Sequence, residues 1–448
     1  MEKLNFKEFQ TTSHQEWQEK IIADLKGKEL KSLSRFTQDG IEIQPNYTTE
    51  NAPSSEFSDF VTQSVKSSHT KDNWYITQEF NCRKPAMANT KMLEALNAGV
   101  DSVKISVPYN INFDILFKDI LPEHIEVRFK NATYDLIKNY YFWCNDNDYD
   151  TRNFEGTFEV FYHRMGDLEE RIELANKVLE YFPKMSLINV SGDNFFNQGG
   201  SNVQQLAVSM ALAHEIFSEM VANEIAPADA AKLISFSFAT GTDYFSEIAK
   251  YRAFKAIWSI VLKEYGVENH AIRVHGITSA WNQTVLDINN NMLRSSTQAL
   301  SAVIGGCQSI TVLPFDNSVR WSNGFSERMA RNTQLIIRDE AFAGKVVDVA
   351  SGSYFIESLT EKIAEKTWEL FVSLEDTGGF KPNMDNGTIP SMIAENREAE
   401  WAKAESGDLT VLGVNKYPNP LEDKEKLFSE KAKNKIKGVR LSDAINKL

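Results

Sequence analysis

Apolar runs of strand length recur eight times between Ser102 and Val349, and a helical pattern fills each gap between them. The runs are VKISV (103–107), IEVRF (125–129), TFEVFY (157–162), SLINV (186–190), LISFSF (233–238), AIRVH (271–275), SITVL (309–313) and VVDV (346–349). Continuous apolar strands are typical of sheets that are buried on both faces, and crossover helices between them indicate parallel pairing. Eight such units close into a barrel, so we predict an α/β fold of the (β/α)8 TIM-barrel type.

The chain divides into three segments around this barrel. Residues 1–38 have no apolar run long enough for a core element, and we expect them to form an N-terminal arm. In this arm Trp17, Ile21, Ile22 and Leu25 form a short apolar stripe with helical spacing, which the barrel or a partner should cover. Residues 39–380 form the predicted barrel domain, and the polar residues 381–448 are expected to form a C-terminal helical extension.

Composition excludes several classes of protein. A net charge of -14 would repel a phosphate backbone, so we expect no nucleic-acid partner. No segment approaches the roughly 20 apolar residues that span a bilayer, and the N-terminal residues lack the apolar core of a signal peptide. Cys82, Cys144 and Cys307 lie far apart and form no CxxC pair, so we expect no disulfide framework and a reduced, cytoplasmic setting.

Candidate reactive groups follow from the predicted strand ends, where barrels carry their chemistry. They are Asp193, Asn194, Asp243, His275 and Asp316. Carboxylates and an imidazole that converge on one pocket could abstract a proton or hold a divalent metal, whereas Asp and Asn are also common caps between a strand and a helix. His275 could equally be a hydrogen-bonded residue inside the barrel, on the same side of its strand as Arg273. The histidine spacing shows no HxH or HExxH pattern, so no zinc site is expected.

Several segments resemble the barrel domain of methylmalonyl-CoA mutases. They are DGIEIQPNY (39–47), ITQEF (76–80), NVSGDNFFNQGGSNVQQLA (189–207), DYFSEIAKYRA (243–253), NNMLRSSTQALSAVIGGCQS (290–309), RNTQLIIRDEAFAGKVVDVASGSYFIE (331–357) and LGVNKY (412–417). The resemblance spans about residues 35 to 417 in the family's order. It implies a TIM barrel associated with adenosylcobalamin and radical chemistry on a thioester.

The chain departs from the catalytic members of that family at the positions that carry the chemistry. Where they read IRQY and SGYH, this chain has Ile76 to Glu79 and Ser191 to Asn194, so a tyrosine is replaced by Glu79 and a histidine by Asn194. Where they read HTQTAG, this chain places Ile277 two residues after His275. The arginine that would pair with the substrate carboxylate has no recognisable counterpart near Arg164, so a buried carboxylate would stay unneutralised.

The cobalamin ligand motif DxHxxG is also missing, and the stretch after Tyr417 is too short for a doubly wound domain of roughly 100 residues. We therefore expect no cobalamin-binding domain, no cofactor and no metal on this chain. The pocket positions Glu79, Asp193, Asn194, His275 and Ile277 are interpreted as degenerate, without a catalytic residue among them.

The resemblance thus implies the small (beta), non-catalytic subunit of a heterodimeric mutase, with adenosylcobalamin in the larger partner. Two alternatives stay open. One is an active barrel enzyme that uses Asp193, Asp243 and His275 on an acyl-CoA or small carbonyl substrate, and the other is a mutase that borrows its cobalamin domain from a separate chain.

Overall fold

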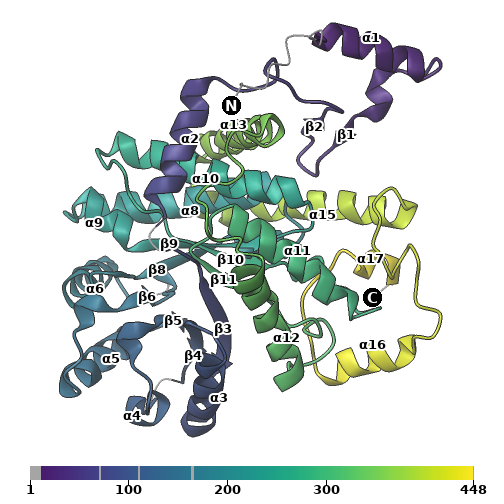
Figure 1. Ribbon diagram of the computed structural model, residues 1–448. Helices are drawn as coiled ribbons and strands as arrows, with labels where there is room; N and C mark the ends of the chain where they lie inside the picture. The colour runs from purple at the N-terminus through teal and green to yellow at the C-terminus, as the bar shows by residue number, and fades with distance from the viewer. Residues whose placement is uncertain (1–11, 70–71, 109–110, 163–165, 447–448) are drawn as a thin grey trace, which may run out of the picture.

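Nine parallel strands of the protein form a barrel, and β1 (Arg35–Phe36) and β2 (Glu42–Ile43) form a separate two-stranded antiparallel sheet (Figure 1). The computed structural model describes residues 12–69, 72–108, 111–162 and 166–446. Its parallel strands are β3 (Tyr75–Asn81), β4 (Ser102–Ser106), β5 (Glu126–Lys130), β6 (Glu155–Thr157), β7 (Met185–Ser186), β8 (Ile188–Ser191), β9 (Ile234–Thr240), β10 (Val274–Thr278) and β11 (Ser309–Thr311). β7 and β8 are two halves of one strand, divided at Leu187; β7 pairs with β6 and β8 pairs with β9. The ring therefore has eight strand positions, and the predicted TIM barrel is confirmed.

One barrel strand was missed in the sequence, and one assigned strand was wrong. Two others are displaced along the chain: the run at 157–162 overlaps β6 only at Thr157, and the run at 271–275 overlaps β10 only at Val274 and His275. The first strand of the barrel is β3, which the pattern of apolar runs missed because YITQEFN carries polar side chains at its centre. The predicted strand at 346–349 is instead a turn, in which Val346 and Val349 are 63% and 53% exposed. A run of four apolar residues does not distinguish a strand from a loop that is fixed by tertiary contacts.

That turn is fixed by a buried ion cluster. Arg252 of α10 (Tyr244–Glu264) donates to both carboxylate oxygens of Asp348, at 2.7 and 3.2 Å, and to Glu357 at 2.8 Å. Asp348 adopts a φ of 50°, and all three side chains are buried. The segments 243–253 and 331–357, which carry much of the family resemblance, therefore meet at this cluster.

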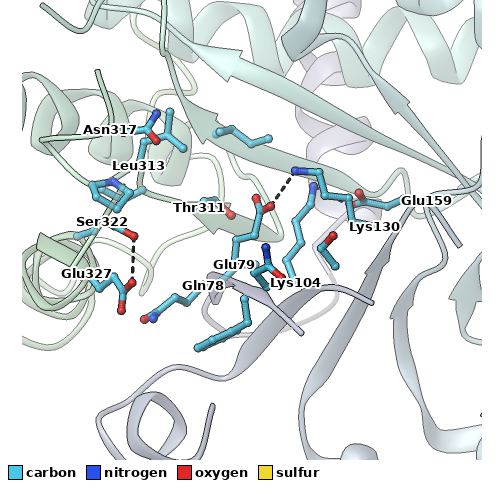
Figure 2. Close-up of a pocket in the computed structure, with 18 of the residues that line it drawn as sticks. Gln78, Glu79, Lys104, Lys130, Glu159, Thr311, Leu313, Asn317, Ser322 and Glu327 are labelled. Atoms are coloured by element: carbon cyan, nitrogen blue, oxygen red, sulfur yellow. Dashed lines mark hydrogen bonds and ion pairs between the residues drawn. The ribbon is translucent and has the colours of Figure 1, made fainter. Parts of the chain in front are cut away.

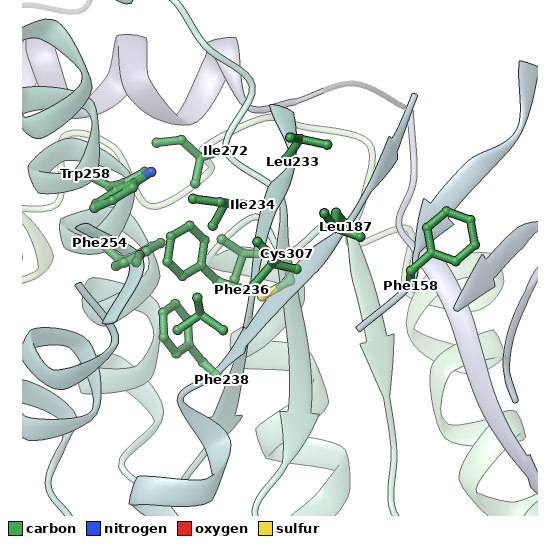
Figure 3. Close-up of a cluster of buried hydrophobic side chains, with 14 of the residues drawn as sticks. Phe158, Leu187, Leu233, Ile234, Phe236, Phe238, Phe254, Trp258, Ile272 and Cys307 are labelled. Carbon is green, nitrogen blue, oxygen red and sulfur yellow. The ribbon is translucent and has the colours of Figure 1, made fainter. Parts of the chain in front are cut away.

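The barrel strands alternate between a polar interior and an apolar exterior. In β9, Ser235 and Ser237 donate hydrogen bonds to Asn189 of β8, inside the barrel. Phe236 and Phe238 point the other way and lie 4.6 Å, between ring centroids, from Phe254 of α10 (Figure 3). The apolar core thus lies mainly between the strands and the surrounding helices.

Three long helices cover one side of the barrel and pack on one another (Figure 1). They are α8 (Asn202–Ala222), α10 and α13 (Tyr354–Asp376). α8 buries an apolar stripe that includes Leu206, Met210 and Phe217, and a capping box between Ser201 and Gln204 begins this helix. α13 begins at Tyr354, directly after its N-cap residue Ser353.

The other helices alternate with the strands or follow the barrel. They include α2 (Ser55–Ser67), α3 (Pro85–Asn97), α5 (Tyr134–Asp146), α6 (Leu168–Tyr181), α7 (Asp193–Phe196), α9 (Pro227–Lys232), α11 (Asn290–Ile304) and α12 (Gly324–Leu335). After α13 come α14 (Phe380–Asp385), α15 (Thr388–Ser406), α16 (Lys424–Lys433) and α17 (Asp443–Asn446). In the described part of the chain, no helix combines the length and apolarity needed to cross a membrane.

The N-terminal segment lies at one end of the molecule, above α13 in Figure 1. Its helix α1 (His14–Asp24) begins with a capping box between Ser13 and Glu16 and has no buried residue. Ile22 is 50% exposed, while Trp17, Ile21 and Leu25 are half-buried. The apolar stripe predicted for this arm therefore exists, and the barrel does not bury it.

Candidate functional site

A cavity of about 1010 Å³ opens at the carboxyl ends of the barrel strands (Figure 2). Four of the pocket positions predicted from the sequence line it: Glu79, Asp193, Asn194 and Ile277. The strand ends, the start of α3 and one face of α12 supply the rest of the wall. The site is thus where the barrel architecture predicts it.

The barrel interior beside and below this cavity is filled by an ion network. Lys104 of β4 lies 2.9 Å from Glu159, and Arg128 of β5 lies 3.2 Å from both Glu159 and Glu126. Burial would raise the pKa of Glu159, but Lys104 and Arg128 outweigh it and hold this pKa below its ordinary value. The interior is therefore occupied by charged side chains that neutralise one another.

His275 lies inside the barrel and is not part of the cavity wall. Its Nδ1 hydrogen-bonds with the Ser309 hydroxyl at 2.7 Å and its Nε2 with the Thr311 hydroxyl at 2.9 Å. Burial, together with Arg128 and Lys104, lowers the pKa of His275 well below its ordinary value. Both ring nitrogens of this neutral imidazole are engaged, which favours the hydrogen-bonding interpretation over acid–base chemistry.

Arg273, two residues earlier, donates to Ser186 at 3.3 Å. Ser186 lies on β7, which is not a neighbour of β10 in the sheet, so this bond crosses the barrel interior. Arg273 and His275 therefore point to the same side, as predicted.

Asp193 begins the short helix α7 at the edge of the cavity. Its Oδ1 is buried and has no hydrogen-bond partner. Burial, reinforced by the charge of Glu159 and opposed by Lys104 and Lys130, raises the pKa of Asp193 to about 6. The neighbouring Asn194 is exposed.

Glu79 and Ile277 occupy the positions at which the resemblance implied a tyrosine and a polar residue. The Glu79 carboxylate accepts a hydrogen bond from Lys130 of β5 at 2.7 Å, as Figure 2 shows. Burial would lower the pKa of Lys130, but Glu79 outweighs it and raises this pKa. Ile277 contributes an apolar surface to the wall.

The other aspartates from the sequence lie outside the cavity. Asp243 occupies the N-cap position of α10, accepts a hydrogen bond from Ser246 at 2.8 Å and lies 3.5 Å from Arg35. Asp316 is buried beside Arg320, at 3.2 Å, and burial raises its pKa. The structure therefore does not bring Asp193, Asp243 and His275 into one pocket.

Arg164, near which the sequence shows no counterpart of the substrate-carboxylate arginine, lies outside the described residues. Among the residues that are described, no group of three His, Cys, Asp or Glu side chains is arranged to hold a metal ion.

Sequence reasoning missed the charged residues of the site. Lys104, Arg128 and Glu159 each interrupt an apolar run, in VKISV, IEVRF and TFEVFY. These residues could have been recognised as a single charge within each buried strand, because a buried charge needs a partner of opposite sign nearby. Which charges meet depends on the closure of the barrel, which brings β4, β5 and the segment after β6 together.

A protein-family model described as methylmalonyl-CoA mutase matches residues 161–445, more than half of the chain. The chain belongs to the methylmalonyl-CoA mutase family. The methylmalonyl-CoA mutase small subunit of Porphyromonas gingivalis is 33% identical to it over 97% of this chain and 73% of that protein. The small subunit of Streptomyces virginiae is 27% identical over 92% of this chain and 71% of its own length. The large subunit from Porphyromonas gingivalis is 32% identical over a shorter stretch, 57% of this chain and 37% of that protein.

Proposed function

We propose that this member of the methylmalonyl-CoA mutase family is a small, catalytically silent subunit. It supports a larger homologous subunit, which interconverts methylmalonyl-CoA and succinyl-CoA with adenosylcobalamin. The similarity to two proteins named small subunits, across most of this chain, supports the subunit role.

The observation that carries the silent role is the pairing of the charged groups at the barrel mouth. Glu79 is bound to Lys130, and Glu159 is bound to Lys104 and Arg128. His275 has both ring nitrogens occupied. Groups that are hydrogen-bonded to one another are poor acids, bases or electrophiles for a substrate, because binding a substrate would first break these bonds.

The sequence also lacks the cobalt ligand of the family. That ligand is the histidine of a DxHxxG motif, and no histidine of this sequence has an aspartate two residues before it. The proposal therefore assigns adenosylcobalamin to the larger subunit.

The N-terminal arm supplies a contact for that subunit. The apolar stripe of α1 is only partly covered in this chain, and the helix stands apart from the barrel in Figure 1. Covering a few hundred Å² of it would contribute several kcal/mol at about 25 cal/mol per Å², before ordering costs. We infer a one-to-one heterodimer in which residues 1 to about 35 contribute to the interface.

Co-expression with a larger mutase subunit from the same genome tests this assignment. Native mass analysis of the purified material should show one copy of each chain. If the two chains elute separately at micromolar concentration, the subunit role is wrong.

A further inference from the structure

The charges of the barrel-mouth cavity do not cancel, although the chain as a whole is acidic. The described lining contains six basic and four acidic side chains, in a protein of net charge -14. Three lysines are each paired with a glutamate: Lys104 with Glu159, Lys130 with Glu79, and Lys91 with Glu327 at 3.8 Å. Apart from these three pairs, the described lining contains three basic side chains and one acidic side chain, Asp193.

These three basic side chains, Arg83, Lys84 and Arg331, belong to the segment after β3 and to α12. Arg83 and Lys84 follow the end of β3 and have no carboxylate partner among the described residues. Arg331 of α12 donates through Nη1 to Gln78 of β3 at 3.0 Å, while its buried Nε has no hydrogen-bond partner. α12 therefore contacts β3, the strand that Arg83 and Lys84 follow, and all three basic side chains line the same cavity.

The lining of the cavity also includes an exposed aromatic side chain. Trp321 lines the cavity just before α12, and it is 73% exposed. The exposed indole ring of a tryptophan can stack on a planar ligand. This stacking does not require one particular base, because every base has a flat face. Guanidinium and ammonium groups, such as those of the exposed Arg83 and Lys84 in the same lining, are the preferred donors to phosphate oxygens.

We propose that the mouth of this barrel is a binding site for a nucleoside phosphate, whose base stacks on Trp321 and whose phosphates contact Arg83, Lys84 and Arg331. The cavity of about 1010 Å³ is large enough for such a ligand without displacing the Lys104 and Glu159 pair. This ligand would differ from the substrate and the cofactor, which the proposed function assigns to the larger subunit.

Calorimetric titration of the full chain with ADP tests this site. Saturable binding is expected, and it should weaken about tenfold in the Arg83→Gln, Lys84→Gln double variant and in Trp321→Ala, since each removes contacts of the charge-assisted or stacking kind. Lys26→Gln with Lys28→Gln makes the same change of charge on the exposed N-terminal arm and should leave binding unchanged. Circular dichroism checks that each variant is folded.

Adenosine and inorganic phosphate separate the two halves of the site. Each alone should bind more weakly than ADP. No saturable binding of ADP at millimolar concentration overturns the proposal, as does an equal loss in the arm variant. Phosphate that binds as tightly as ADP also overturns it, because the tryptophan would then play no part. None of these results depends on whether the chain turns over methylmalonyl-CoA, so failure here leaves the silent-subunit proposal intact.

Discussion

Removing the Arg252 side-chain charge should destabilise the fold more than most single substitutions in this chain. Arg252 is fully buried and donates to Asp348 and Glu357, which are also buried. Burial would lower the pKa of this guanidinium, yet the two carboxylates raise it above its ordinary value, so the cluster is charged in the native state. In Arg252→Met, both carboxylates lose their counter-ion inside the protein.

The magnitude follows from the cost of an unpaired buried charge. Breaking a buried ion pair by removing one partner costs about 3–5 kcal/mol, far more than an exposed pair contributes. The Thr360 hydroxyl, at 3.1 Å from Arg252, would lose a donor as well. We therefore expect the free energy of unfolding to fall by about 3–5 kcal/mol.

Urea denaturation followed by circular dichroism measures this change. Lys381→Met is the matched control, because Lys381 pairs with Asp385 on an exposed helix surface and the variant should resemble the parent chain. A fall of less than about 1 kcal/mol in Arg252→Met would refute the reasoning, since the cluster would then behave like a surface pair.

Three further predictions concern the cavity and the arm. Burial raises the pKa of Asp193 to about 6 in the folded chain, so the folded state holds this proton more tightly than the unfolded state does. The resulting contribution to the free energy of unfolding is fully present below about pH 4 and is lost as the pH rises through about 6. Asp193→Asn should therefore be more stable than the parent chain by about 1–3 kcal/mol at neutral pH, with the difference vanishing near pH 4 in denaturation at a series of pH values; a constant difference would contradict the shift. Deleting residues 1–30 should weaken association with the larger subunit and leave the circular dichroism of the barrel unchanged; undiminished affinity would place the interface on the barrel helices. Glu79→Tyr with Asn194→His should give no mutase activity, because pocket groups act as a unit, and measurable turnover would show that these two positions alone silence the chain.

The number of barrel strands could be predicted from the sequence, but not the identity of all of them. LISFSF at 233–238 gave β9 almost to the residue, because its phenylalanines pack on α10 and its serines are small enough for the interior. β3 was missed since Gln78 and Glu79, at its centre, face the cavity and not a core. The turn at 346–349 was mistaken for a strand because its conformation depends on Arg252, almost 100 residues away.

The sequence predicts that the candidate site lies at the strand ends, but not how its side chains pair. Asp193 and Asn194 were found because they come shortly after the apolar run that ends at Val190. The pairing of Glu79 with Lys130 could not be found, since these residues are 51 positions apart and meet only when the barrel closes. Likewise, His275 could be placed on a strand from the sequence, but the two hydroxyls that engage it belong to β11.

Turnover by the isolated chain tests the central claim most directly. A coupled assay with methylmalonyl-CoA and adenosylcobalamin, together with a spectral titration of cobalamin, should show neither product nor saturable binding for this chain alone. The same assay should show product when the larger subunit is added. Micromolar binding of adenosylcobalamin accompanied by turnover in the absence of the larger subunit would contradict the account.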